Sequence, residues 1–308
     1  MQKNVERKES VMAYKGKKTK KVPIYKQPAF WLAIAAVIMV LVLVIWIAVA
    51  LSAEVFTIRK PDATEAPVSQ TAPEETTEET LPPPPENPYG TADFKINQET
   101  GEITLTSGNA LKGIDVSEWQ GEIDWQQVKD AGVEFVIIRV GGRGTTEGGL
   151  YEDAYAQRYY EGAVAVGLKV GAYIFSQSIT VEEAVNEAKY VLAQIKDWDV
   201  QMPVVYDWEY VDSEARTGDM DSRTLTDMAK AFCDTVKEAG YTPMIYFGRS
   251  QSMDMMHLEE LVDYPFWLAM YSTVMDYPYK IDMWQYTDQG TVPGIAGSVD
   301  MNLMFTYE

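Results

Sequence analysis

Apolar and polar residues alternate along residues 111–308 in a pattern that predicts short strands separated by amphipathic helices. Runs rich in Val and Ile are typical of buried strands, whereas apolar residues three and four positions apart are typical of helices. Strands that alternate with helices in this way predict parallel βαβ units. The expected strands are 112–116, 135–140, 169–175, 202–208 and 242–247, and the expected helices are 124–131, 151–166, 181–195 and 222–239.

The pattern changes after residue 247. Three strand-like segments follow, at 266–271, 281–286 and 298–305, and the last two connections are too short for regular crossover helices. Five βα units and three closely spaced strands predict an incomplete, TIM-like (β/α)5(β)3 barrel over 111–308, since about 198 residues are too few for a full barrel of about 250. The active site of such a barrel is expected at the carboxyl ends of its strands.

An uncharged apolar segment at residues 29–53 precedes this domain. As a helix it would span about 37 Å, enough to cross a hydrocarbon core of about 30 Å. Residues 1–27 hold nine Lys and Arg against two Glu. The positive-inside rule therefore predicts a basic cytoplasmic tail (1–28), a single transmembrane helix (29–53) and an extracellular C-terminal domain at the cell membrane. Secretion after cleavage of a signal peptide is the alternative, although the apolar run is long for one.

The segment from 54 to 92 is rich in Pro, Thr and Glu and poor in apolar residues. Such a composition cannot bury a core and predicts a disordered, extended stalk outside the cell. Residues 93–110 then resemble a short hairpin, with its turn at 99–102. A basic tail alone would also suit a nucleic acid, but the apolar segment directly after it explains the charge better. No nucleic-acid partner is expected.

The chain contains one cysteine, Cys233, and one histidine, His257. A serine or cysteine nucleophile needs a histidine beside it, and zinc hydrolases usually use two or more. The helical pattern around Cys233 predicts a buried side chain, and His257 is expected at the surface. If the chain is an enzyme, carboxylates are therefore the expected catalysts, with no metal.

Two carboxylates, Asp207 and Glu209, close the fourth expected strand. Side chains two positions apart share one face of a strand and lie about 6–7 Å apart, so each charge opposes ionisation of the other. Asp115 ends the first strand, and Asp300 lies in the eighth. In a closed barrel these four acids would line opposite sides of one cleft, as hydrolysis of a glycoside by paired carboxylates requires. The alternative is that each is a solvated carboxylate at a strand end.

The motifs that carry these acids resemble glycoside hydrolase family 25, the Chalaropsis-type lysozymes or N-acetylmuramidases. The resemblance runs from about residue 112 to 305, and its strength lies in the shared order and spacing of motifs that are individually weak. The matching motifs are 113–121 (GIDVSEWQG), 135–139 (FVIIR), 171–175 (GAYIF), 207–209 (DWE), 266–271 (FWLAMY), 283–286 (MWQY) and 299–302 (VDMN).

The resemblance implies a peptidoglycan hydrolase that cleaves the β-1,4 bond between N-acetylmuramic acid and N-acetylglucosamine with net retention and without a cofactor. Glu209 matches the general acid of that family, and Asp207, Asp115 and Asp300 match its other site acids. The partners implied are the glycan strands of peptidoglycan. The aromatic residues that match positions lining the groove are Tyr173, Tyr246, Trp267, Trp284 and Tyr286.

Two other functions stay open at this point. A wall-binding module could keep the barrel without its chemistry, although the intact Asp207 and Glu209 argue against it. Another retaining glycosidase, such as a chitinase-like barrel, would carry a longer run of acids before Glu209, and Val205 occupies a position where that run needs one.

Overall fold

The computed structural model describes residues 81–307. Within that range, no helix has both the length and the apolar character needed to cross a bilayer. The predicted cytoplasmic tail (1–28), the predicted transmembrane helix (29–53) and most of the predicted stalk lie outside the described residues. They stay predictions.

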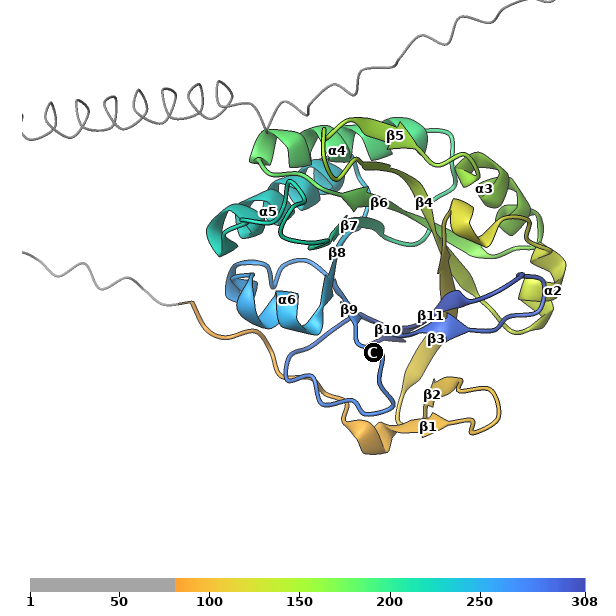
Figure 1. Ribbon diagram of the computed structural model, residues 1–308. Coiled ribbons are helices and arrows are strands. Elements are labelled where there is room, and N and C mark those ends of the chain that lie inside the picture. The colour runs from red at the N-terminus through yellow and green to blue at the C-terminus, as the bar shows by residue number, and fades with distance from the viewer. Residues whose placement is uncertain (1–80, 308) are drawn as a thin grey trace, which may run out of the picture. The chain divides into compact units, whose positions relative to one another are not determined.

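Eight strands form a closed, barrel-like ring (Figure 1). The eight strands pair in the order β3-β11-β10-β9-β8-β7-β6-β4, and pairing of β3 with β4 closes the ring. A ninth strand, β5 (Leu150–Glu152), lies outside the ring and pairs antiparallel with the carboxyl end of β4. The expected eight-stranded barrel is thus present. The ring strands are β3 (Asn109–Val116), β4 (Phe135–Arg143), β6 (Lys169–Ser176), β7 (Val204–Trp208), β8 (Pro243–Gly248), β9 (Phe266–Ala269), β10 (Met283–Gly290) and β11 (Val299–Thr306).

Helices cover the outside of the ring (Figure 1). Asp124, Thr180 and Asp221 cap three of them, because each side chain accepts a hydrogen bond from a free N–H of the first turn. The expected helix 151–166 begins only at Ala156, since residues 150–152 form β5 instead. The helices are α2 (Trp125–Asp130), α3 (Ala156–Ala165), α4 (Val181–Gln194), α5 (Ser222–Glu238) and α6 (Arg249–Asp254), with short 3-10 turns η2 (Thr91–Asp93), η3 (Glu118–Gln120) and η4 (Leu258–Glu260).

Two hydrophobic cores result from the alternation of side chains along the strands. In β4, Val136 and Ile138 point outward into the core beneath the helices, while Ile137 points into the barrel. Gly113 is required on the inner side, because a Cβ there would lie 2.2 Å from the ring of Phe135. Phe135, Met244 and Met283 come early in their strands and fill the barrel away from the carboxyl ends, whereas Tyr246 and Trp267 of the same inner core reach the other end. Polar side chains can therefore occupy the opposite end.

The last strand runs against its neighbours. β11 pairs antiparallel with both β10 and β3, whereas the pairs from β3 through β4, β6, β7, β8 and β9 to β10 are parallel. Asp300 therefore reaches the carboxyl ends of the other strands from the beginning of its own strand. Its register partner is Asp115, at the end of β3. The expected site at the carboxyl ends of the parallel strands thus includes Asp300, which comes from the start of an antiparallel strand.

Residues 85–92, which we call the strap, lie against the barrel. Glu86 forms an antiparallel bridge with Tyr279, and the Asn87 side chain donates to the carbonyl of Tyr277 at 3.1 Å. The ring of Tyr89 stacks on that of Tyr307, with centroids 5.9 Å apart. The predicted end of the stalk at residue 92 is therefore too late, because the chain already contacts the barrel at Pro85.

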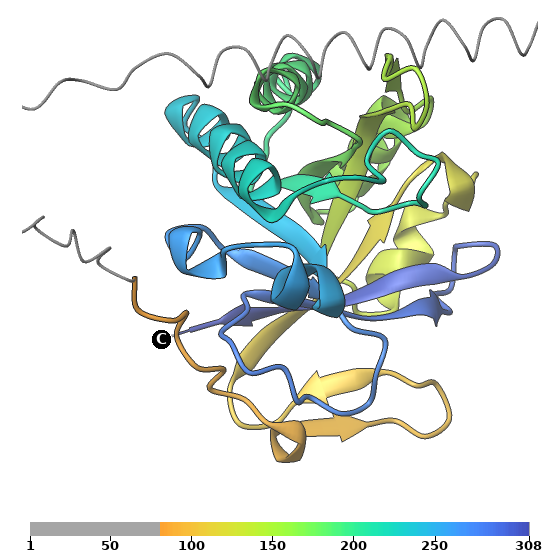
Figure 2. The same cartoon turned by 60° about the vertical axis from the view of Figure 1, so that its left-hand side comes forward.

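The expected hairpin is present next to the strap. It consists of β1 (Phe94–Ile96) and β2 (Ile103–Leu105), and both views place it outside the ring beside β3 and β10 (Figures 1 and 2). Gly101 has a φ of 73° in the turn, a conformation that favours glycine. Phe94 packs edge-on against Trp284, with ring centroids 5.2 Å apart. The barrel itself begins at Asn109, two residues earlier than expected.

Replacing Phe94 should weaken the attachment of the hairpin. We expect Phe94→Ala to lower the free energy of unfolding by about 2 kcal/mol, because this ring is half-buried and a fully buried Phe is worth roughly 3–5 kcal/mol. Lys95→Ala changes the neighbouring exposed side chain of the same strand and should be neutral. Urea unfolding of the full chain and both variants measures the difference. Equal midpoints for all three would show that the hairpin does not stabilise the barrel.

Candidate active site

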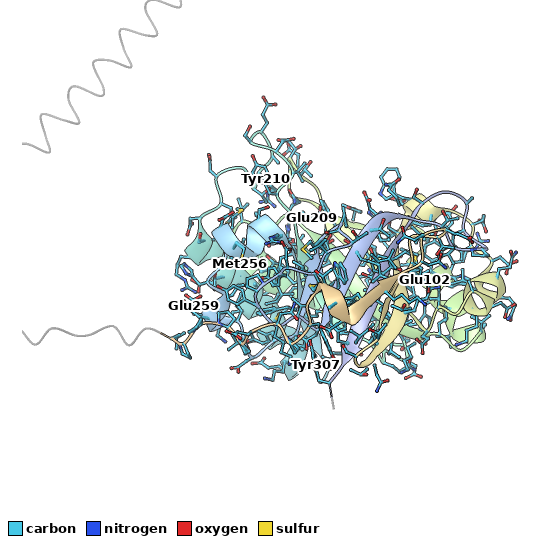
Figure 3. All side chains as sticks on the ribbon, turned by 90° about the horizontal axis from the view of Figure 1, so that it is seen from below. Glu102, Glu209, Tyr210, Met256, Glu259 and Tyr307 are labelled. Carbon is cyan, nitrogen blue, oxygen red and sulfur yellow. The ribbon has the colours of Figure 1, made fainter. Side chains whose placement is uncertain are left out.

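The four predicted acids meet in one hollow. Asp115, Asp207, Glu209 and Asp300 all line a cavity of about 190 Å³ at the carboxyl ends of the parallel strands. Figure 3 shows Glu209 at one end of the barrel and Tyr307 at the opposite end. We call this cavity the acid cleft.

Asp115 and Asp300 form one side of the acid cleft. Burial raises the pKa of Asp115, while hydrogen bonds from Asn302 (2.7 Å) and Gln285 (3.0 Å) to its Oδ1 act in the opposite direction. Burial also raises the pKa of Asp300 to about 9, and the neighbouring charge of Asp115 adds to this shift. Asp300 therefore retains its proton at neutral pH, while Asp115 has the donors that a carboxylate needs.

Asp207 and Glu209 form the other side. Burial raises the pKa of Asp207 well above its usual value, the charges of Glu209 and Asp115 add to this, and Arg139 opposes it. The pKa of Glu209 is also raised, first by burial and then by the charge of Asp115, while a hydrogen bond with Asp207 opposes the shift. Mutual repulsion, the cause expected from the sequence, is thus secondary to burial. Among the described residues, the buried Oδ1 of Asp207 has no hydrogen-bond partner.

Two glutamines hold the backbone around Glu209. The side-chain amide of the buried Gln177 donates to the carbonyl of Glu209 at 2.7 Å and accepts from the hydroxyl of Thr217 at 3.2 Å. Gln251, from α6, donates to the carbonyl of Trp208 at 2.9 Å. The last carbonyl of β7 and the next one along the chain therefore bind neighbouring segments. These contacts fix the course of the backbone at Glu209.

Arg139 is a cation of this site that the sequence analysis did not assign. It lies in β4, lines the acid cleft and is 7% exposed. Its Nε donates to the buried Asp153 at 2.8 Å, and another guanidinium nitrogen donates to Glu118 at 3.1 Å. An arginine within a buried strand must have partners. That rule could have marked Arg139 as a site candidate, but it could not have named the partners.

Three of the five predicted aromatic residues line the acid cleft, namely Tyr173, Tyr246 and Trp267. Trp284 is fully buried in the outer core, so its assignment to the groove is wrong, and Tyr286 does not line the acid cleft. Side chains alternate along β10, and Gln285 is the residue that points into the cleft, where it accepts from Tyr246 at 2.9 Å.

The other two aromatic residues belong to the outer core. Trp284 is fully buried, donates to the carbonyl of Met270 at 2.8 Å and packs against Phe94 of the hairpin. Tyr286 packs beside it, with ring centroids 5.9 Å apart. Both residues therefore attach the hairpin to the barrel rather than bind a ligand in the acid cleft.

Exposed rings stand at the rim of the acid cleft. Trp119, on η3, is 80% exposed, and Tyr271, after β9, is 55% exposed. Aromatic rings of this kind stack on flat apolar faces such as those of sugar rings. Both residues lie within the matching motifs, but exposure in a loop has no periodic signal that marks a site residue in the sequence.

A metal candidate exists away from the acid cleft. Among residues 81–307, the group that could hold an ion is His257, Glu259 and Glu260 on η4, and Arg223 already binds Glu260. His257 is partly exposed, close to the expected surface position, and Cys233 is fully buried in α5 as expected. The absence of a metal from the reaction stays a prediction.

The chain is similar to known proteins. An autolytic lysozyme of Clostridium acetobutylicum is 29% identical over 196 residues, covering 62% of this chain and 55% of that protein. Lysozyme M1 of Streptomyces globisporus is 28% identical over 211 residues, covering 64% and 68%. The solved structure of the modular autolysin LytC from Streptococcus pneumoniae matches with a TM-score of 0.58 at 29% identity, covering 69% of this chain and 50% of that one. This chain thus spans about half the length of the autolytic lysozyme and of LytC.

The model of one protein family, glycosyl hydrolases family 25, matches residues 114–295, which is more than half of the chain. The matched range contains three of the four acids, and the fourth, Asp300, pairs with Asp115 across β3 and β11. The chain therefore belongs to glycosyl hydrolases family 25, and its barrel is a glycoside hydrolase domain.

Proposed function

We propose that this chain hydrolyses peptidoglycan, cleaving the β-1,4 bond between N-acetylmuramic acid and N-acetylglucosamine with net retention. The observation that carries the proposal is the pairing of two unequal carboxyl groups. Glu209 has a raised pKa at the mouth of the acid cleft, and Asp207 offers a buried, unpartnered oxygen beside it. The names of the matched lysozymes and of the autolysin support the same substrate.

Glu209 is the proposed general acid. Burial and the charge of Asp115 keep a proton on its carboxyl group at a pH where an exposed glutamate would have lost it. The two glutamine contacts hold the backbone from which this side chain extends. Glu209 then donates the proton to the glycosidic oxygen as the bond to the sugar breaks.

Asp207 is proposed to act on the other side of the bond. Its free Oδ1 can accept the N–H of the 2-acetamido group, which turns the acetamido oxygen toward the anomeric carbon. That oxygen displaces the leaving group, and water then opens the cyclic intermediate while Glu209 accepts the proton of the water. Two displacements at one carbon give net retention.

Asp115 and Asp300 are proposed to support this chemistry. The charge of Asp115 raises the pKa of Glu209, and the amide donors of Gln285 and Asn302 hold Asp115 in position. Asp300, protonated at neutral pH, can donate a hydrogen bond to a sugar oxygen.

Removing the carboxyl group of Glu209 should show whether the chain is an enzyme or a wall-binding module. We expect Glu209→Gln to slow lysis of purified peptidoglycan by about 10²–10⁴-fold, the usual contribution of general acid catalysis, while binding to insoluble peptidoglycan persists. Glu214→Gln makes the same chemical change on an exposed loop after β7 and should leave the rate unchanged. Lysis and pull-down assays measure the two properties. Binding without lysis by the unaltered chain would favour the binding module.

The pH profile should report the electrostatic role of Asp115. Removing its charge in Asp115→Asn should lower the pKa of Glu209. A general acid must be protonated, so activity is lost as pH rises through its pKa, and the basic limb of the kcat/KM profile should move to lower pH. Glu214→Gln again serves as the control and should leave the limb in place. A basic limb that does not move in Asp115→Asn would show that Asp115 does not hold the proton on Glu209.

We also propose that the domain lies outside the cell, tethered at the membrane by residues 29–53. The support is the basic tail before an uncharged segment of 25 residues. Protease added to intact, wall-stripped cells should remove the barrel and leave a membrane-bound N-terminal fragment, whereas protease-treated cells that retain the whole chain would contradict export. A mature protein that begins at Leu51 would show that the segment is a cleaved signal peptide.

A further inference from the structure

A second hollow adjoins the acid cleft beside the hairpin. It measures about 510 Å³, within the range of about 300–1,000 Å³ that is usual for small-ligand sites. Its walls come from β2 and the turn before it, from residues 271–273 after β9, and from Tyr286 and Thr287 of β10. Tyr271 also lines the acid cleft, so the two cavities share a wall. We call this cavity the hairpin hollow.

The hairpin hollow depends on a segment outside the matched family range. Its wall residues Gly101 and Ile103 precede residue 114, where the family match begins. The turn is held on the barrel by the ion pair of Glu102 with Lys112 at 2.8 Å, and Figure 3 labels Glu102. Contact of Phe94 with Trp284 holds the other end of the hairpin. The wall is therefore a fixed surface of the domain.

The chemistry of this wall suits an uncharged, hydroxyl-rich ligand. Ser272, Thr273 and Thr287 supply hydroxyl groups, and the described residues that line the hollow include no Asp, Glu, Lys or Arg. The ring of Tyr271 is 55% exposed, and its hydroxyl donates to Gln285 at 3.0 Å. A ring fixed in this way offers a stacking surface with little loss of side-chain entropy on binding.

Gln285 connects this ring to the acid cleft. Its Oε1 accepts from both Tyr271 and Tyr246, and its Nε2 donates to Asp115. The stacking surface is therefore tied to a residue that raises the pKa of the proposed acid. A ligand that extends past Tyr271 therefore contacts a ring whose position is fixed relative to the acids of the cleft.

We propose that the hairpin hollow binds a further N-acetylated sugar of the same glycan strand, beyond those held in the acid cleft. The inference rests on the proposed function, and it makes this chain selective for long glycan strands over short oligosaccharides. A neutral sugar is the occupant, rather than a peptide stem, because the ionic groups of a stem find no counter-charge among the residues that line the hollow.

The test compares the affinities of short and long glycans in a full chain that does not turn them over. In a Glu209→Gln background, a peptide-free octasaccharide of alternating N-acetylglucosamine and N-acetylmuramic acid should bind about tenfold more tightly than the tetrasaccharide, which is about 1.4 kcal/mol. Thr273→Trp fills the hollow from its exposed side and should abolish this gain without changing the affinity for the tetrasaccharide. Val274→Trp adds the same ring at the next exposed position, which does not line the hollow, and should preserve the gain.

Several outcomes would overturn the proposal. They are an equal affinity for both glycans before Thr273 is changed, a gain that survives in Thr273→Trp, and a gain that appears only when the glycans carry peptide stems. The last result would assign the hollow to the peptide. The proposed function is tested separately by turnover in the unaltered chain, because failure to cleave glycans leaves the affinity comparison intact. A length-dependent affinity without turnover would support the hairpin hollow and reject the hydrolase.

Discussion

Asp115 is almost fully buried beside three other carboxyl groups, and its charge is stabilised there by the side-chain amides of Gln285 and Asn302. Those two amides come from β10 and β11, so closure of the barrel is what brings them to the end of β3. The remaining electrostatics follow from this contact. Burial raises the pKa of Asp300 on the neighbouring strand and that of Glu209 across the cleft, and a negative charge held at Asp115 raises both further. Burial and the charge of Asp115 thus favour the protonated form of two other acids.

Such a cluster makes folding stability depend on pH. Asp300 has a folded-state pKa of about 9 against 3.8 for the unfolded chain. The folded protein therefore binds more protons than the unfolded chain between those values. The stability contributed by protonated Asp300 is complete below about pH 3.8 and is lost as the pH rises through about 9. The two hydrophobic cores, inside the barrel and beneath the helices, must offset this loss at the pH where the enzyme acts.

The sequence was sufficient for the parts of the fold that a local pattern determines. Asp207 and Glu209 were placed on one face because they are charged residues two positions apart at the end of β7, and side chains two positions apart share a face of a strand. The assignment of Trp284 to the groove failed because both faces of β10 are buried there. Apolar character therefore does not show which side chains point into the barrel and which point toward the outer core. The direction of β11 could have been inferred, since the short connection from Gly290 to Val299 cannot form a parallel crossover. The strap was missed because Tyr89 is one aromatic residue in a run of prolines, and only the surface it meets shows its role.

The strap also fixes where the chain enters the domain. Tyr89 stacks on Tyr307, directly after β11, and the end of β11 pairs with the beginning of β3 at Asn109. That end of the barrel is opposite the acid cleft, as the positions of Tyr307 and Glu209 in Figure 3 show. The strap therefore joins the barrel at the end opposite the acid cleft. A glycan strand can then approach the acids without passing the strap. The hairpin, which continues directly from the strap, carries the same segment of chain along the barrel toward the cleft, where its turn forms the wall of the hairpin hollow.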